Sequence, residues 1–215
     1  MVYASQMSSI SLTHMQQDTR KSRRDEYSEA TKAALLAAAR KLFTAEGYQA
    51  TGIEAVARES RVTRGALYHH FEDKRALFDA VVVELQGGAA ALVAARAGAA
   101  RDPWTALRLG TEAFIDACLD PAYLRLVIQE GPAVLGIARC REIDMAHSRG
   151  MLEAALANLR RSGELDFESP DLLSSMFAAM ECQAALVIAD SGDRRRFKAQ
   201  ALDALDRMLN AFRKR

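Results

Sequence analysis

Cysteine, proline and net charge are all scarce in this chain of 215 residues, and each scarcity excludes a class of protein. The three cysteines, Cys118, Cys140 and Cys182, are odd in number and far apart, which argues against a disulfide framework and against a zinc site. They are typical of buried thiols in a reducing compartment, so we expect a cytoplasmic protein. A formal net charge of +1 gives no overall basic surface, and any contact with nucleic acid must therefore be local.

Long uninterrupted apolar runs are also missing. The longest strongly apolar stretch, 172–189, is interrupted by Glu181, and charge-free runs such as 85–95 are too short to span a bilayer. The first 27 residues contain no continuous apolar segment of the kind a signal peptide needs. We therefore expect neither a transmembrane protein nor a membrane partner.

The chain has none of the short motifs that position catalytic groups, phosphates or metal ions. It contains no Gly-x-Ser-x-Gly, no glycine-rich phosphate loop, no His-Glu-x-x-His and no cysteine pair at metal-ligand spacing. We expect no enzyme activity, no cofactor and no bound metal.

What the chain does contain is alanine, with 41 residues against 25 valines, isoleucines and threonines together, a balance that favours helices over strands. All four prolines can be placed at helix starts, where the missing N–H costs nothing. The sequence therefore predicts an all-α protein. Beyond residue 73 the expected helices lie near 74–100, 103–118, 121–130, 133–162, 170–190 and 193–213.

The N-terminal region divides into an arm and a compact unit. Residues 1–27 lack periodicity and carry a basic cluster at 20–24, so we expect a disordered arm that is either a solvated tail or a contact to DNA. Order is expected from Ser28, with a first helix to Glu46 that Gly47 ends. This places the domains at 1–27, 28–75 and 76–215.

Two short helices with a tight turn follow the first helix. We expect Thr51 to cap the second helix, Thr63 to cap the third and Asp73 to cap the fourth, with residues 60–62 as the turn. A longer helix that braces two short ones joined by such a turn is a helix-turn-helix pattern.

The same segment resembles the N-terminal domain of the TetR/AcrR family of repressors. The resemblance rests on Leu67-Tyr68-x-His70-Phe71-x-x-Lys74 after a Val-Thr-Arg-Gly helix start, and on Ala-Ala-x-x-Leu-Phe at 38–43. It implies a DNA-binding domain whose third helix enters the major groove.

Along that third helix, Arg64 and Tyr68 share the outer face, and Arg64 is placed to contact a guanine edge. Gly65 allows a close approach of the backbone to DNA, and Ala66 suits a thymine methyl. The resemblance implies that Tyr68 and Lys74, among others, hold phosphates. The candidate DNA-binding residues are Thr51, Thr63, Arg64, Gly65, Ala66, Tyr68, His69, His70 and Lys74.

Arg61 departs from the family pattern, which usually has glycine at this place in the turn. A non-glycine residue in the left-handed conformation costs about 1 kcal/mol. Either the turn differs here, or Arg61 adds a phosphate contact.

The resemblance further implies a helical C-terminal domain that forms a homodimer and holds a ligand pocket. The last two expected helices leave little polar face, which suits two-fold packing. For each candidate pocket residue, packing in the core is the alternative to ligand contact. The candidate ligand-binding residues are Trp104, Phe114, Cys118, Tyr123, Met145, His147, Met151 and Met180.

These features together predict a transcriptional repressor that an unknown small-molecule effector releases from a palindromic DNA operator. The alternative is a DNA-binding activator or architectural protein without ligand control.

Overall fold

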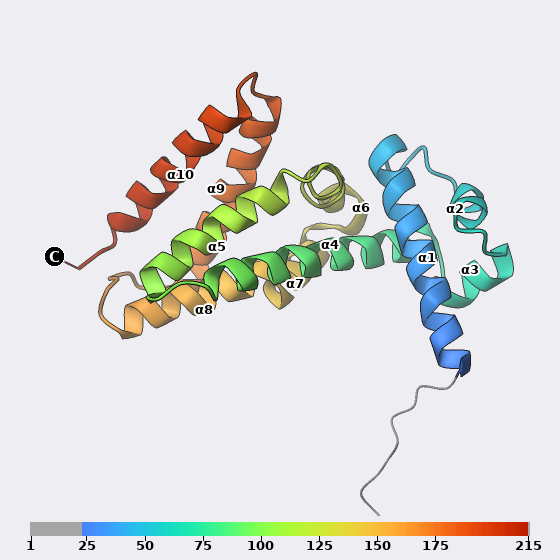
Figure 1. Cartoon of the computed structure of the whole chain (residues 1–215), viewed down its shortest axis with the longest axis horizontal. Coiled ribbons are helices and arrows are strands. Elements are labelled where there is room, and N and C mark those ends of the chain that lie inside the picture. The colour runs from blue at the N-terminus through green and yellow to red at the C-terminus, as the bar shows by residue number, and fades with distance from the viewer. Residues whose placement is uncertain (1–22, 215) are drawn as a thin grey trace, which may run out of the picture.

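The computed structural model describes residues 23–214, and within that range the chain forms helices and no strand (Figure 1). The predicted all-α fold is confirmed. The elements are α1 (Arg23–Glu46), α2 (Ile53–Ser60), α3 (Arg64–His70), α4 (Lys74–Ala97), α5 (Pro103–Cys118), η1 (Tyr123–Glu130), α6 (Gly131–Leu135), α7 (Ile137–Ala146), α8 (Ser148–Arg161), α9 (Pro170–Asp190) and α10 (Arg194–Asn210).

Helix α1 begins at Arg23, before the expected Ser28, so Arg23 and Arg24 belong to its first turn. Most of the predicted basic arm, including Arg20 and Lys21, lies outside the described residues. Helices α1, α2 and α3 form one end of the molecule, and α4 runs from them into the C-terminal helices (Figure 1).

Helices α1–α3 form the N-terminal domain, and side-chain caps fix the starts of α3 and α4. Thr63 accepts a hydrogen bond from the Ala66 N–H at 3.2 Å, and Asp73 accepts one from the Ala76 N–H at 2.7 Å, both as predicted. The predicted cap by Thr51 is wrong. Gly52 is the cap residue of α2 and has no side chain to accept a bond, while the buried Thr51 hydroxyl donates to the Gly47 carbonyl at 2.8 Å.

The turn between α2 and α3 keeps its helix-turn-helix geometry without glycine. Arg61 adopts the left-handed conformation, with φ of 56°, and ends α2. It is the one non-glycine residue with positive φ among residues 23–214. The departure from the family pattern therefore costs conformational energy and leaves the turn unchanged.

One hydrophobic core joins the N-terminal domain to the rest of the protein. Leu35 and Phe43 of α1 pack with Leu67 of α3, Phe78 of α4 and Leu126 of η1. A second core lies between α5, α8, α9 and α10. Because α4 and η1 contribute to the first core, a shift of either helix must displace side chains that pack against the N-terminal domain.

The expected helix at 133–162 is wrong as a single element. Gly136, with φ of 85°, separates α6 from α7, and His147, with φ of −129° and ψ of −122°, separates α7 from α8. Hydrophobic periodicity predicts neither break. Glycine often ends a helix, but histidine is not a residue type that does so, and the break at His147 therefore has no signal in the sequence. The helix expected near 121–130 is present, but residues 123–130 are wound as a π-helix.

Two helices, α4 and α9, are long and apolar enough to cross a membrane by length and composition alone. Core helices of water-soluble proteins pass the same test. Both helices contribute buried residues to the cores described above, for example Phe78 and Phe177.

Candidate nucleic-acid interface and ligand cavity

Helix α3 presents one face to the core and the other to solvent. Leu67 is buried against α1 and α4, whereas Arg64, Tyr68 and His69 are exposed. The Arg64 guanidinium lies 5.5 Å from the centroid of the Tyr68 ring and 3.4 Å from the Glu54 carboxylate of α2. This exposed pair stabilises the protein little, so Arg64 is free to exchange Glu54 for another acceptor.

Gly65 lies on the same exposed face, next to Arg64. A Cβ atom built at this position meets no atom within 4 Å. Nothing inside the described protein therefore requires glycine here. A small residue at this point matters only to a molecule that approaches α3 from outside, as DNA would.

His70 follows at the end of α3 and is half-buried. Burial lowers its pKa, and the neighbouring His69 and Lys32 lower it further. At neutral pH His70 is therefore mainly uncharged, so it is available as a hydrogen-bond donor and not as a cation.

Lys74, at the start of α4, binds within the protein. Its ammonium donates to the carbonyl oxygens of Tyr48 at 2.9 Å and Thr51 at 3.1 Å, and it lies 4.4 Å from the centroid of the Tyr48 ring. Lys74 thus holds the loop between α1 and α2 in place.

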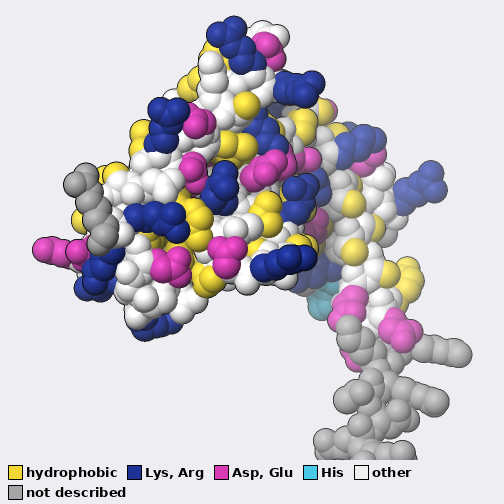
Figure 2. Space-filling model, turned by 60° about the vertical axis from the view of Figure 1, so that its left-hand side comes forward, with side chains coloured by type: hydrophobic (Ala, Val, Ile, Leu, Met, Phe, Trp, Pro, Cys, Tyr) yellow, Lys and Arg dark blue, Asp and Glu magenta, His cyan; other side chains and the backbone are white. Residues whose placement is uncertain are grey.

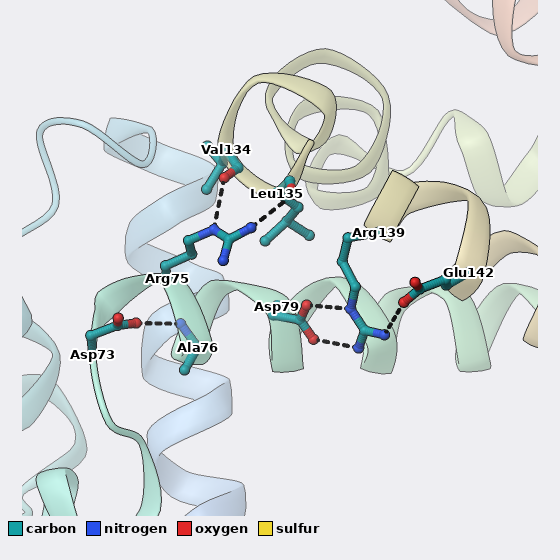
Figure 3. A network of polar contacts seen from close by, with 8 residues as sticks. All are labelled: Asp73, Arg75, Ala76, Asp79, Val134, Leu135, Arg139 and Glu142. Carbon is teal, nitrogen blue, oxygen red and sulfur yellow. Dashed lines mark hydrogen bonds and ion pairs between the residues drawn. The ribbon is translucent and has the colours of Figure 1, made fainter. Parts of the chain in front are cut away.

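Charged side chains of α4, the helix that follows the N-terminal domain, tie it to α6 and α7 (Figure 3). Arg75 donates to the carbonyl oxygens of Val134 at 3.1 Å and Leu135 at 2.8 Å. One turn further on, Asp79 accepts two hydrogen bonds from Arg139 of α7, at 2.7 and 2.9 Å. These bonds, with the one to Glu142, raise the pKa of Arg139, so its guanidinium stays charged.

A second set of contacts runs from η1 to the end of α1. Arg125 donates to the carbonyl oxygens of Thr44 at 2.8 Å and Ala45 at 3.0 Å, and it pairs with Glu130 at 3.0 Å. The Tyr48 backbone N–H donates to Glu130 at 2.8 Å. We call Arg125 and Glu130 the η1 clamp.

Gly47 leaves the space that the η1 clamp occupies. Its φ is 88°, and a Cβ atom here lies 2.6 Å from Nη2 of Arg125 and 2.8 Å from Oε1 of Glu130. Both the backbone conformation and the close approach therefore require glycine.

A cavity of about 470 Å³ lies among α4, α5, η1, α7, α8 and α9. Its wall is largely apolar, with a few polar groups, which is the usual composition of a small-molecule site. Tyr123 donates to Oε1 of Gln86 at 2.9 Å, and the Gln86 amide donates to Asp144. Burial raises the pKa of Asp144, and it raises the pKa of Glu181 to about 8, against a smaller opposing effect of the Thr111 hydroxyl.

Comparison with known proteins gives the family. Residues 35–81 match the family described as bacterial regulatory proteins, tetR family, and residues 104–212 match the tetracyclin repressor-like C-terminal domain. The chain belongs to the TetR family of transcriptional regulators. Its N-terminal domain is therefore a DNA-binding helix-turn-helix domain.

Individual relatives agree with this assignment. A TetR-family regulator from Pectobacterium atrosepticum has a solved structure with 31% identity and a TM-score of 0.71, over 91% of this chain and 99% of that one. The TetC protein of transposon Tn10 from Escherichia coli is 27% identical over 73% of this chain and 79% of its own. RolR, solved with resorcinol, shares the fold at 18% identity and a TM-score of 0.66, over 86% of this chain and 89% of RolR.

The predicted DNA-binding residues divide into two groups. Thr63, Arg64, Gly65, Ala66, Tyr68, His69 and His70 lie together along α3. Thr51 and Lys74 do not extend this surface, because Thr51 is 1% exposed and the Lys74 ammonium is bound to loop carbonyls. A surface motif does not reveal which of its polar side chains bind inside the domain.

Of the eight predicted ligand-binding residues, Phe114, Tyr123 and Met151 line the cavity. Cys118 is buried against Cys182, and Met180 packs in the second core. Trp104 lies 4.3 Å from the Arg213 guanidinium, Met145 is exposed, and His147 forms the break before α8. Periodicity identifies inward-facing residues but does not distinguish a cavity wall from packed core.

The residues predicted from the sequence do not include Gln86, Asp144 and Glu181, three polar residues of the cavity wall. Glu181 did carry a signal, since it interrupts the most apolar stretch of the chain. A charged residue inside an otherwise apolar helix is rarely buried without a partner or a function.

Proposed function

We propose that this protein is a homodimeric repressor that binds a palindromic operator through α3 and leaves it when a small molecule enters the cavity. The observation that carries the proposal is the position of η1. Tyr123, Val127 and Ile128 of η1 line the cavity, while Arg125 and Glu130 of the same helix hold the DNA-binding domain. One short helix therefore contacts both the occupant of the cavity and the DNA-binding domain, so a ligand that moves η1 also changes the orientation of that domain.

The DNA contacts that we propose come from the exposed face of α3. Arg64 reads a base in the major groove, Gly65 and Ala66 allow close approach, and Tyr68, His69 and His70 bind phosphates. Arg61 adds a phosphate contact from the turn, since its side chain is exposed beside this face.

Dimer formation is supported by apolar side chains left at the surface of the C-terminal domain (Figure 2). On α9, Leu172, Met176 and Val187 follow a helical spacing of four and eleven residues and are 61%, 54% and 47% exposed. On α10, Phe197 and Met208 are also exposed and share one face. Such stripes favour packing against a second copy.

Release of DNA follows from this geometry. A two-fold dimer presents two α3 helices to half-sites about 34–36 Å apart. A ligand that prefers one position of η1 and α4 selects the dimer in which that spacing is wrong for DNA. We place the protein in the cytoplasm, where the operator and the effector meet.

The first experiment is selection of bound sequences from random duplex DNA with the purified protein. We expect an enriched palindrome whose half-sites lie one helical turn apart. Addition of an effector to that complex then measures release. If the selected DNA stays bound at saturating occupancy of the cavity, ligand control is wrong and a DNA-binding protein without it remains. If a folded dimer enriches no sequence at low salt, the operator proposal fails.

Dimer formation is tested separately. Met176→Lys places a charge in the exposed stripe of α9, and we expect it to produce monomers in sedimentation velocity and to weaken operator binding. Arg195→Glu changes an exposed residue outside the stripe and serves as the control. A Met176→Lys protein that stays dimeric would remove α9 from the interface.

A further inference from the structure

Two carboxyl groups, Glu181 and Asp144, lie in the cavity wall, and among the described residues Glu181 has no cationic partner. Glu181 of α9 is 3% exposed, and Asp144 of α7 is partly buried. Among residues 23–214 neither forms an ion pair, but Asp144 accepts a hydrogen bond from Gln86, and the nearby Arg149 partly offsets the effect of burial on the pKa of Asp144. A buried carboxyl group without a counter-ion is costly in its charged form.

The basic residues of the wall do not supply a counter-ion to Glu181. Arg149 of α8 lines the cavity, but its guanidinium forms an ion pair with Asp171, which is not part of the wall. Arg141 of α7 lines the rim, and its side chain is exposed. Among the described residues, Glu181 is therefore the buried carboxyl group of the wall that no cation neutralises.

Aromatic rings in the wall add to the same preference. Phe114 of α5 and Tyr123 of η1 pack edge to face, with ring centroids 6.2 Å apart and an interplanar angle of 87°. The hydrogen bond to Gln86 holds the Tyr123 ring in place. Aromatic faces attract cations, and the attraction grows when the cation is desolvated.

We propose that the cavity binds an organic cation, an ammonium or amidinium group on an apolar body, and that Glu181 is its counter-ion. The regulatory meaning of such a ligand rests on the proposed function above. The binding itself requires no DNA and can be measured alone.

Binding of a cation must be linked to a proton. Burial raises the pKa of Glu181 to about 8, so without ligand the group is mainly protonated at neutral pH. The titratable groups that interact with Glu181 are Cys118 of α5 and Tyr123 of η1, neither of them a cation, and the Thr111 side chain of α5 partly offsets the effect of burial. A bound cation favours the carboxylate, so Glu181 releases its proton, and affinity rises with pH until about pH 8.

The test uses two fluorescent probes of nearly equal size, protonated 9-aminoacridine and neutral acridine, at pH 7.5 and without DNA. We expect the wild-type protein to bind 9-aminoacridine at least about tenfold more tightly than acridine, as a desolvated ion pair requires. Glu181→Gln should remove most of this difference and leave the affinity for acridine within about twofold. Glu84→Gln, at an exposed site on α4, is the matched control and should change neither affinity.

Calorimetry in two buffers of different ionisation enthalpy provides a second readout on the unmodified protein. We expect wild-type protein to release a proton when it binds 9-aminoacridine and none when it binds acridine. Equal affinity for the two probes, binding of neither, or cation binding without proton release would overturn the proposal. Recovery of an operator from random DNA by the same preparation would show that the regulator assignment stands even if the ligand class fails.

Discussion

The DNA-binding face and the ligand cavity are built in opposite ways. The face comes from one continuous stretch, 63–70, in which cap, outer face and inner face follow from helical periodicity. The cavity is assembled from several helices, with Gln86, Asp144 and Glu181 almost a hundred residues apart at the extremes. A site on one helix can be recognised in the sequence, whereas a site between helices depends on how they pack.

Two glycines, Gly47 beside the η1 clamp and Gly65 on the DNA-binding face, test this difference most directly. Gly47→Ala introduces a side chain at positive φ against the η1 clamp, and we expect it to lower the free energy of unfolding by about 2–4 kcal/mol. Gly65→Ala should leave stability unchanged or raise it by up to about 1 kcal/mol, yet weaken DNA binding. Chemical denaturation and operator titration of both variants measure the two effects. Equal stability of the two variants would show that the η1 clamp adjusts freely.

The cavity, unlike the DNA-binding face, should make the stability of the protein depend on pH. Since the folded-state pKa of Glu181 is raised from 4.5 to about 8, the folded protein keeps a proton that the unfolded chain loses. Stability should therefore fall between about pH 4.5 and pH 8, by up to about 1.4 kcal/mol per unit, and level off above. Glu181→Gln should lack this slope and exceed the wild type in stability near pH 8. Thermal unfolding of both proteins across this pH range measures the difference. Parallel pH profiles of stability for the wild type and Glu181→Gln would contradict the prediction.

Arg64 and Lys74 belong to one motif, and the structure assigns them different roles. Arg64→Ala should weaken operator binding by about 1–3 kcal/mol and relax specificity at one base pair, with stability unchanged. Lys74→Met should mainly lower stability, by about 1–3 kcal/mol, because the loop carbonyls lose their donor. Binding-site selection and thermal melts distinguish them. Unchanged base preference in Arg64→Ala would exclude base reading by this residue.

The smallest effect is expected at the turn. Arg61→Gly relieves the left-handed strain and should stabilise the protein by about 1 kcal/mol. If Arg61 binds a phosphate, the variant should bind all DNA sequences less tightly. The slope of log K against log salt concentration should also fall by the amount that about one phosphate contact contributes. Operator titration at several salt concentrations measures this. An unchanged salt slope would leave Arg61 as a purely conformational departure.

Much of the N-terminal domain could be predicted because its signals are local. Thr63 and Asp73 lie one position before helical periodicity begins, and both are caps. Thr51 shows the limit of the same reasoning. It has the right residue type near a helix start, but the fold buries it one position too early, where its hydroxyl bonds to Gly47.

In the C-terminal domain, composition and proline positions predicted helices, and they marked the starts of α5 and α9 well. They did not predict the breaks at Gly136 and His147, or the π-helical winding of η1. The break at Gly136 has a local signal, a glycine with positive φ at the end of α6, whereas His147 and residues 123–130 carry none.

The sequence by itself determined the helical class, the helix-turn-helix and the residues of α3 that face outward, because each depends on neighbours within a few turns. Only the tertiary structure decided that Lys74 binds a loop, that η1 joins a cavity to the DNA-binding domain, and that Glu181 lies in that cavity without a counter-ion. These are relations between side chains on different helices. Their distances and their burial exist only once the helices have packed.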